Sequence, residues 1–229
     1  SAHLILVSSL YEFKSSSLLI DISLHLGSLV AIVYYFKEEL LNINKNKRLI
    51  SLIIIGSIPL IIFGYILYTT GLIYSLRNIE TIAWTTLIFA IVLYISDKSR
   101  FDKKISSNLN IQSILFIGIM QILSLIPGVS RAGVTITAAR ILKFNRVDSS
   151  KISFLLSIPA LAGASVLSLK DIFNQPTEFN YLVIIAIISS FIFSFLTVKY
   201  FLIFINKFSM NAFVIYRIII ALVLFSLIY

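Results

Sequence analysis

Six runs of about 20 apolar residues constrain this chain more than any other feature of its sequence. They are Leu18–Phe36, Leu49–Tyr68, Ile79–Ser96, Ile152–Leu169, Tyr181–Ile205 and Ala212–Tyr229. That length lets an α-helix cross the hydrocarbon core of a bilayer. Only 13% of the residues are charged, against about 25% in a typical soluble domain. The sequence therefore predicts an all-α integral membrane protein with six transmembrane helices.

Two further apolar segments are too short or too broken to cross. One is Ser1–Leu10, and the other is Ile111–Leu142, which Pro127 and Gly128 interrupt. Irregular backbone at membrane depth is tolerated only where it is buried in protein or lines a wet cavity. We therefore predict that both segments are re-entrant, and that Ile111–Leu142 is a helical hairpin entering and leaving on the same side.

The charges of the loops support the re-entrant interpretation. Lys37–Arg48 and Asp97–Asn110 each hold four basic residues and Lys143–Lys151 holds three, whereas the other loops hold one each. With a re-entrant hairpin all three basic loops fall on one side, which the positive-inside rule assigns to the cytoplasm. A single crossing by the hairpin would break this pattern. The net charge of +9 thus reflects topology, and we expect no nucleic-acid partner.

The same map contains a weak internal repeat. Residues 1–96 and 111–229 each hold one re-entrant segment followed by three spans, and they start from opposite sides of the membrane. We therefore expect a single membrane domain over residues 1–229, built from two inverted-topology halves. In such folds the site lies near the midplane, where the broken helices of both halves meet. Inverted repeats are also a transporter architecture, so transport is the competing function.

The tip of the second hairpin has the composition of an anion site. Gly128 permits a tight turn, Ser130 stands at the start of the outgoing helix, and Arg131 and Thr135 share one face of that helix. A helix N-terminus attracts anions, and the planar guanidinium suits phosphate. The competing interpretation is that Ser130 only caps the helix and that the Arg131 side chain only extends to the membrane–water interface. A buried arginine costs at least about 2.5–3.5 kcal/mol, which favours a phosphate ligand.

Other polar residues on apolar segments are weaker candidates. His3 could be a packed core residue, or a base or nucleophile toward phosphorus. Arg217 in the last span needs either a counter-charge or a phosphate. Asp21 and His25 are one turn apart and could pair or line the cavity, and Arg140 is placed to complement the dipole of the hairpin helix.

The sequence offers no metal-ligand set for phosphoryl transfer. The chain has no cysteine, and no carboxylate stands near His3 or Arg131 in the sequence. Carboxylates that hold a divalent cation or serve as a base are the usual complement of such chemistry. We therefore assign no metal ligand within this chain.

The motifs together resemble one family, the bacterial undecaprenyl-diphosphate phosphatases associated with bacitracin resistance. Pro127-Gly128-Val129-Ser130-Arg131 with Thr135 resembles the family signature, and Ser1-Ala2-His3-Leu4 resembles the end of its first motif. Further matches are Leu26-Gly27-Ser28, Ile58-Pro59, Ser153 to Pro159 and Ile215-Tyr216-Arg217. Ala132 stands where the family usually has serine. The resemblance spans nearly the whole chain.

The resemblance implies hydrolysis of undecaprenyl diphosphate to the monophosphate lipid carrier of cell-wall synthesis. It implies a multi-pass protein of the bacterial plasma membrane with its site open to the periplasm. His3, Ser130 and Arg131 would then be catalytic, and Gly128, Ser130, Arg131, Thr135 and Arg217 would bind the substrate.

The resemblance also implies a divalent cation, Mg²⁺ or Ca²⁺, held by a glutamate motif upstream of Ser1. We accordingly expect the natural protein to begin earlier and this segment alone to be a poor catalyst. Flipping of a polyprenyl phosphate is the alternative function. A homodimer is compatible with either function.

Overall fold

The computed structural model describes residues 17–72, 78–98, 103–173 and 181–228, and these segments are predominantly helical. The longer helices are α2 (Ser17–Tyr35), α4 (Ile43–Thr70), α6 (Ile79–Lys98), α10 (Arg146–Phe173), α11 (Tyr181–Lys207) and α12 (Asn211–Ile228). The shorter elements are α3 (Lys37–Leu41), α7 (Ile105–Asn108), α8 (Ile111–Ile122), the 3₁₀ turn η1 (Leu123–Leu125) and α9 (Arg131–Ile141).

Each of the six predicted spans coincides with one of the long helices. Five of them, α4, α6, α10, α11 and α12, are long and apolar enough to cross a membrane. In α2 the apolar part whose side chains are described, Ile22–Tyr35, is shorter than a full span. The protein is therefore an all-helical, multi-pass membrane protein, and crossing by α2 stays a prediction.

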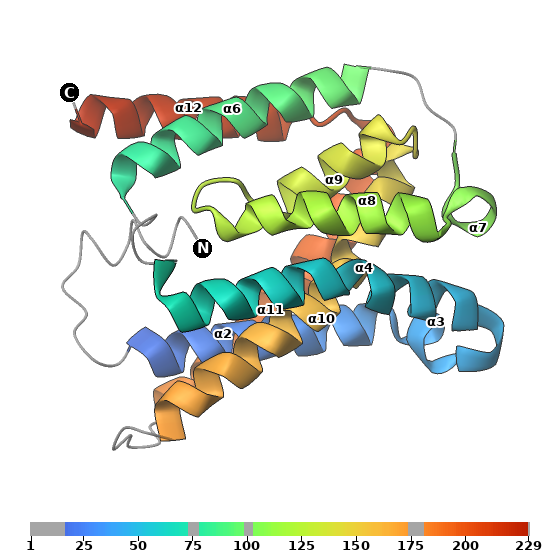
Figure 1. Ribbon diagram of the computed structural model, residues 1–229, viewed down its shortest axis with the longest axis horizontal. Helices are drawn as coiled ribbons and strands as arrows, with labels where there is room; N and C mark the ends of the chain where they lie inside the picture. The colour runs from blue at the N-terminus through green and yellow to red at the C-terminus, as the bar shows by residue number, and fades with distance from the viewer. Residues whose placement is uncertain (1–16, 73–77, 99–102, 174–180, 229) are drawn as a thin grey trace.

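The predicted hairpin is present and lies between two groups of helices (Figure 1). On one side α6 and α12 lie against each other; on the other are α2, α4, α10 and α11. Helices α8 and α9 have 12 and 11 residues, well short of the roughly 20 needed to cross. The start of α8 lies at the end of the molecule that also carries α3 and α7, while the turn between α8 and α9 lies inside.

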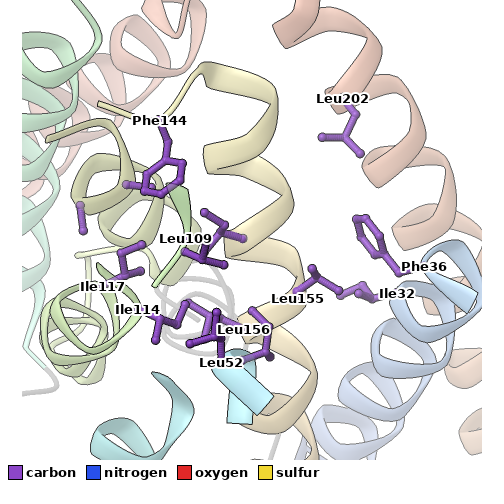
Figure 2. Packing of buried hydrophobic residues seen from close by; sticks show 14 of the residues in the cluster. Ile32, Phe36, Leu52, Leu109, Ile114, Ile117, Phe144, Leu155, Leu156 and Leu202 are labelled. Carbon is purple, nitrogen blue, oxygen red and sulfur yellow. The ribbon is translucent and has the colours of Figure 1, made fainter. Parts of the chain in front are cut away.

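Apolar side chains fix the hairpin against the second group of helices. Ile114 and Ile117 of α8 are fully buried beside Leu156 of α10, in a cluster that continues to Ile32 and Phe36 at the end of α2 (Figure 2). At the crossing of α4 and α8 a Cβ added to Gly118 would lie 2.1 Å from the Gly56 carbonyl oxygen. Close approach through glycine favours helix association in a membrane, where dispersion between packed helices replaces the hydrophobic effect.

A buried ionic cluster joins four elements at the end of the molecule where α9 finishes. The Asp97 carboxylate, with its residue 3% exposed, lies 3.2 Å from Arg140 Nε and 2.8 Å from Arg146 Nε. Its Oδ2 also accepts a hydrogen bond from the Met210 backbone at 3.0 Å. Arg140 therefore forms a specific ion pair in addition to its place in the last turn of α9. Its partner could not be identified locally, because Asp97 is the first charged residue after an apolar span and resembles the start of a loop.

Candidate active site at the hairpin tip

The turn between α8 and α9 adopts a backbone that few residues tolerate. Gly128 has φ +91°, and a Cβ there would lie 2.1 Å from Thr85 Oγ1 and 2.7 Å from the Ile82 carbonyl oxygen. Ser130, the N-cap of α9, also has a positive φ of 62°. A strained non-glycine residue persists only where its surroundings hold it, and such residues concentrate at functional sites. The backbone conformation of the tip is therefore held by the residues that surround it.

The surrounding helices hold the turn by its carbonyl oxygens. Thr85 Oγ1 donates to Pro127 O at 2.6 Å, and Thr86 Oγ1 donates to Gly128 O at 3.3 Å. The guanidinium of Arg217, on α12, donates to Gly128 O at 2.8 Å and to Val129 O at 3.2 Å. The negative ends of these peptide groups are thus directed toward α6 and α12.

Arg217 therefore binds the backbone of the turn through its two Nη atoms, whereas its buried Nε has no hydrogen-bond partner among the described residues. The residue is 9% exposed and also donates to the Thr86 carbonyl oxygen at 3.4 Å. The sequence predicted either a counter-charge or a phosphate as its partner, and in the described structure peptide carbonyls take that place. It nevertheless lines the same cavity as Arg131, so it belongs to the site as a group that shapes the turn.

Ser130 and Arg131 present donors at the start of α9. Ser130 Oγ accepts from the Gly133 backbone N–H at 3.3 Å, which is the capping contact of the competing interpretation; its role toward a ligand stays a prediction. The first N–H groups of a helix have no intrahelical acceptor, and they carry the positive end of the helix dipole. Arg131 Nη1 is buried and has no hydrogen-bond partner among the residues that the structure describes. A buried guanidinium nitrogen without a partner is costly, so this atom is a donor that an anionic ligand could satisfy.

These groups open on a cavity of about 670 Å³, within the usual range for a small-molecule site. Its polar lining comes from both sides of the tip: His25, Thr86, Ser124, Ser130, Arg131, Tyr216 and Arg217. The rest is mostly apolar and comes from η1, the turn itself and α4, α6, α9, α10, α11 and α12. The cavity thus has a cationic region at the hairpin tip and apolar walls elsewhere, which suits a lipid with a charged head group.

Two further predicted residues differ in their outcome. His25 lines the cavity, which is one of the two roles predicted for it. Thr135 does not: it is 0% exposed, and its hydroxyl donates to Arg131 O at 2.9 Å and shares a 2.7 Å hydrogen bond with Ser153 Oγ. Its place one turn after Arg131 is as predicted, but here its side chain ties α9 to α10 and does not reach the ligand space.

Some residues of the site were missed, and some lie outside the described part. Thr85 and Thr86 were not singled out, because threonine in an apolar span is common and nothing local reveals the carbonyl it will contact. His3 and the rest of the first re-entrant segment lie outside the described residues. The side chain of Asp21 is likewise not described, so its pairing with His25 stays a prediction.

The described residues do not form a site for a divalent cation. Within the ranges that the structure describes, no group of three or more histidine, cysteine, aspartate or glutamate side chains comes together. Among the described residues, the cavity lining contains one imidazole, that of His25, and no carboxylate. Mg²⁺ and Ca²⁺ prefer oxygen ligands, with carboxylates foremost. The described lining is suited to an anion, and any cation ligands would have to come from elsewhere.

Comparison with known proteins gives matches over nearly the whole chain. The family described as Bacitracin resistance protein BacA matches residues 1–223. An undecaprenyl-diphosphatase of Pelagibacter ubique is 65% identical over 230 residues, covering 100% of this chain and 90% of that protein. Undecaprenyl-diphosphatases of Elusimicrobium minutum and Alcanivorax borkumensis are 39% and 34% identical, covering 95% and 98% of this chain and 86% and 89% of those proteins.

Proposed function

The chain belongs to the bacitracin resistance protein BacA family, and we propose that the hairpin-tip cavity is where it cleaves the diphosphate of undecaprenyl diphosphate. The activity is that of an undecaprenyl-diphosphatase, as in relatives that cover 100% and 95% of the chain. The reaction breaks the bond between the terminal phosphorus and the bridging oxygen. Water supplies the new oxygen, and the lipid monophosphate is the leaving group.

One observation carries the assignment of the site: the unpartnered Nη1 of Arg131 at the wall of the cavity. The nitrogen lies in the first turn of α9, where free backbone N–H groups add to the positive potential. A phosphate oxygen would satisfy both sets of donors at once. Because the walls are mostly apolar, this attraction is stronger than it would be in water.

The same donors can serve the chemical step. Negative charge redistributes over the transferred phosphoryl oxygens as the bond breaks, and fixed donors that meet this charge lower the barrier without reorganising. Ser130 and Arg131 are preorganised because Thr85, Thr86 and Arg217 hold the carbonyl side of the turn. We assign Arg217 and the two threonines as positioning residues that act through the backbone of the turn.

His3 and a divalent cation complete the proposal. His3 would act as base or nucleophile from the first re-entrant segment, facing the hairpin tip in the arrangement expected of inverted repeats. A divalent cation, when bound, would neutralise diphosphate charge. The described cavity lining supplies no ligands for it, so no step here depends on it.

We further propose six membrane crossings in one domain with two inverted halves. In such a repeat α2 would be equivalent to α10, and α6 to α12. In support, the two helices of each of these pairs pack against each other. The repeat would also make α4 equivalent to α11. The packing of α2 on α11 then corresponds to the packing of α10 on α4, and both are present. The basic loops would lie in the cytoplasm and the cavity would open to the periplasm of the plasma membrane. A homodimer remains a prediction.

Phosphate release by the purified full-length protein tests the site assignment. We expect Arg131→Ala to lower turnover of undecaprenyl diphosphate by at least about 100-fold, the scale of a lost transition-state donor. Arg48→Ala is the matched control and should retain turnover, because this exposed arginine near the start of α4 donates to Leu109 O and does not line the cavity. Unchanged turnover in Arg131→Ala would exclude this residue from the site.

A further inference from the structure

Ser124 is a polar residue of the cavity wall that neither holds the turn nor caps a helix. It lies in the 3₁₀ turn η1, which ends the incoming limb of the hairpin formed by α8 and η1, and it lines the same cavity as Arg131. Ser124 stands three residues before Pro127, and Arg131 stands three residues after Gly128. Because η1 packs against α9, the outgoing limb, Ser124 and Arg131 flank the tip from opposite limbs.

The hydroxyl of Ser124 is free to bind a ligand. A serine in a helix commonly donates to the carbonyl oxygen three or four residues earlier. Ser57 does so to Ile53 O at 2.8 Å, and Ser96 to Leu93 O at 2.9 Å. Ser124 makes no such bond, and its hydroxyl has no hydrogen-bond partner in the part of the chain that the structure describes. A half-buried donor thus remains unused at the wall of a mostly apolar cavity.

The backbone that carries Ser124 is held in place. The Ile126 N–H donates to Leu123 O at 3.1 Å, which closes the turn around Ser124. Just beyond it, Thr85 Oγ1 holds the Pro127 carbonyl oxygen at 2.6 Å. A hydrogen bond from Ser124 to a ligand would therefore cost only the rotation of one short side chain, and the backbone would not have to become ordered.

The chemistry of a diphosphate suits a donor at this position. A diphosphate presents acceptor oxygens on both of its phosphorus atoms, so it can accept hydrogen bonds from more than one direction. Arg131 and the first N–H groups of α9 approach from the outgoing limb. Among the described lining residues, those of the incoming limb carry no charge, and Ser124 is their hydroxyl donor. A hydroxyl bound to an anionic oxygen makes a stronger hydrogen bond than it makes to a neutral one.

Building on the proposed function, we propose that the Ser124 hydroxyl donates a hydrogen bond to the diphosphate of the substrate. Ser124 then binds the head group from the incoming limb, as Arg131 does from the outgoing limb. The bond is present in the bound substrate as well as during cleavage, so its loss weakens binding and leaves the chemical step unchanged. Loss of Ser124 therefore changes KM, whereas loss of Arg131 lowers turnover.

Serine-to-alanine substitutions on the incoming limb test this role in the full-length protein. Ser124→Ala should raise KM for undecaprenyl diphosphate and the inhibition constant of inorganic diphosphate roughly tenfold, the scale of one hydrogen bond to a charged group, with kcat unchanged. Ser113→Ala is the matched control and should behave as the wild type. The Ser113 hydroxyl also has no hydrogen bond among the described residues, but it lies near the start of α8 and outside the cavity lining.

The outcomes separate the role of Ser124 from the proposed function. If the wild type releases phosphate and Ser124→Ala keeps the KM and the inhibition constant of Ser113→Ala, Ser124 is not a ligand of the diphosphate. A lower kcat at unchanged KM would also overturn the proposal, since the hydroxyl would then act only in the chemical step. If the wild type releases no phosphate from undecaprenyl diphosphate, the proposed function itself fails.

A complex of the wild type with methylenediphosphonate gives a second measurement that needs no variant. We expect Ser124 Oγ to lie about 2.5–3.0 Å from a phosphonate oxygen, the usual range for a hydroxyl donor. A diphosphonate bound at the hairpin tip and out of hydrogen-bonding distance of Ser124 Oγ would overturn the proposal.

Discussion

Replacing Arg217 with lysine tests whether its guanidinium shapes the turn or binds the substrate directly. Lysine keeps the positive charge but has a single ammonium in place of the planar fork. The fork makes two good hydrogen bonds, to Gly128 O at 2.8 Å and Val129 O at 3.2 Å, and a long one to Thr86 O at 3.4 Å. An ammonium can keep one of the two good bonds. A lost hydrogen bond of a charged group is worth about 1.5–3 kcal/mol.

We therefore expect Arg217→Lys to lower kcat by roughly 10- to 150-fold, since each 1.36 kcal/mol changes a rate tenfold. The inhibition constant of inorganic phosphate should change little, because the charge stays in the cavity. Phosphate release from undecaprenyl diphosphate in detergent micelles measures the first quantity, and competition by phosphate measures the second. Arg48→Lys, at an exposed arginine, is the matched control. A variant with wild-type kcat would refute the positioning role, and one with weakened phosphate inhibition but normal kcat would make Arg217 a ligand.

Three further substitutions test other parts of the site. Gly128→Ala should abolish activity or folding, because its Cβ would lie 2.1 Å from Thr85 Oγ1, whereas Gly163→Ala, with nothing within 4 Å, should be tolerated; equal expression and turnover of the two would contradict this geometry. Asp97→Asn should destabilise the protein by about 3–5 kcal/mol, because it leaves two arginines without their carboxylate. Thermal unfolding in micelles measures that loss, and an unchanged Tm would disprove the ion pairing. Thr135→Val should lower Tm through the lost bond to Ser153 while leaving the inhibition constant of phosphate unchanged; weaker phosphate binding at unchanged Tm would restore Thr135 as a ligand.

The helices and the hairpin could be predicted from the sequence, because each follows from local properties. An apolar run of sufficient length specifies a span, and Pro127 and Gly128 between two runs too short to cross specify a turn. Arg131 could also be singled out as a candidate, since a buried arginine next to that turn is costly without a partner, and it does line the cavity. Its charge and position are both visible in the sequence.

The partners of the other residues could not be predicted, because they depend on which helices pack together. Arg217 signals a buried charge equally well with phosphate or with peptide carbonyls as its partner. Thr135 shares a helix face with Arg131, but that face is wide enough for one side chain to line the cavity while the other contacts α10. Asp97 becomes a buried counter-ion only when α6, α9 and α10 meet. Periodicity places a residue on a helix, and tertiary packing decides what it contacts.

The most direct test is a structure of the full-length protein with a non-hydrolysable prenyl methylenediphosphonate. We predict one phosphonate oxygen within hydrogen-bonding distance of Arg131 Nη1, and the first backbone N–H groups of α9 directed at the same phosphonate group. Arg217 should still be bound to the carbonyl oxygens of the turn. A diphosphonate bound away from the hairpin tip, with Arg131 Nη1 still unpartnered, would contradict the account.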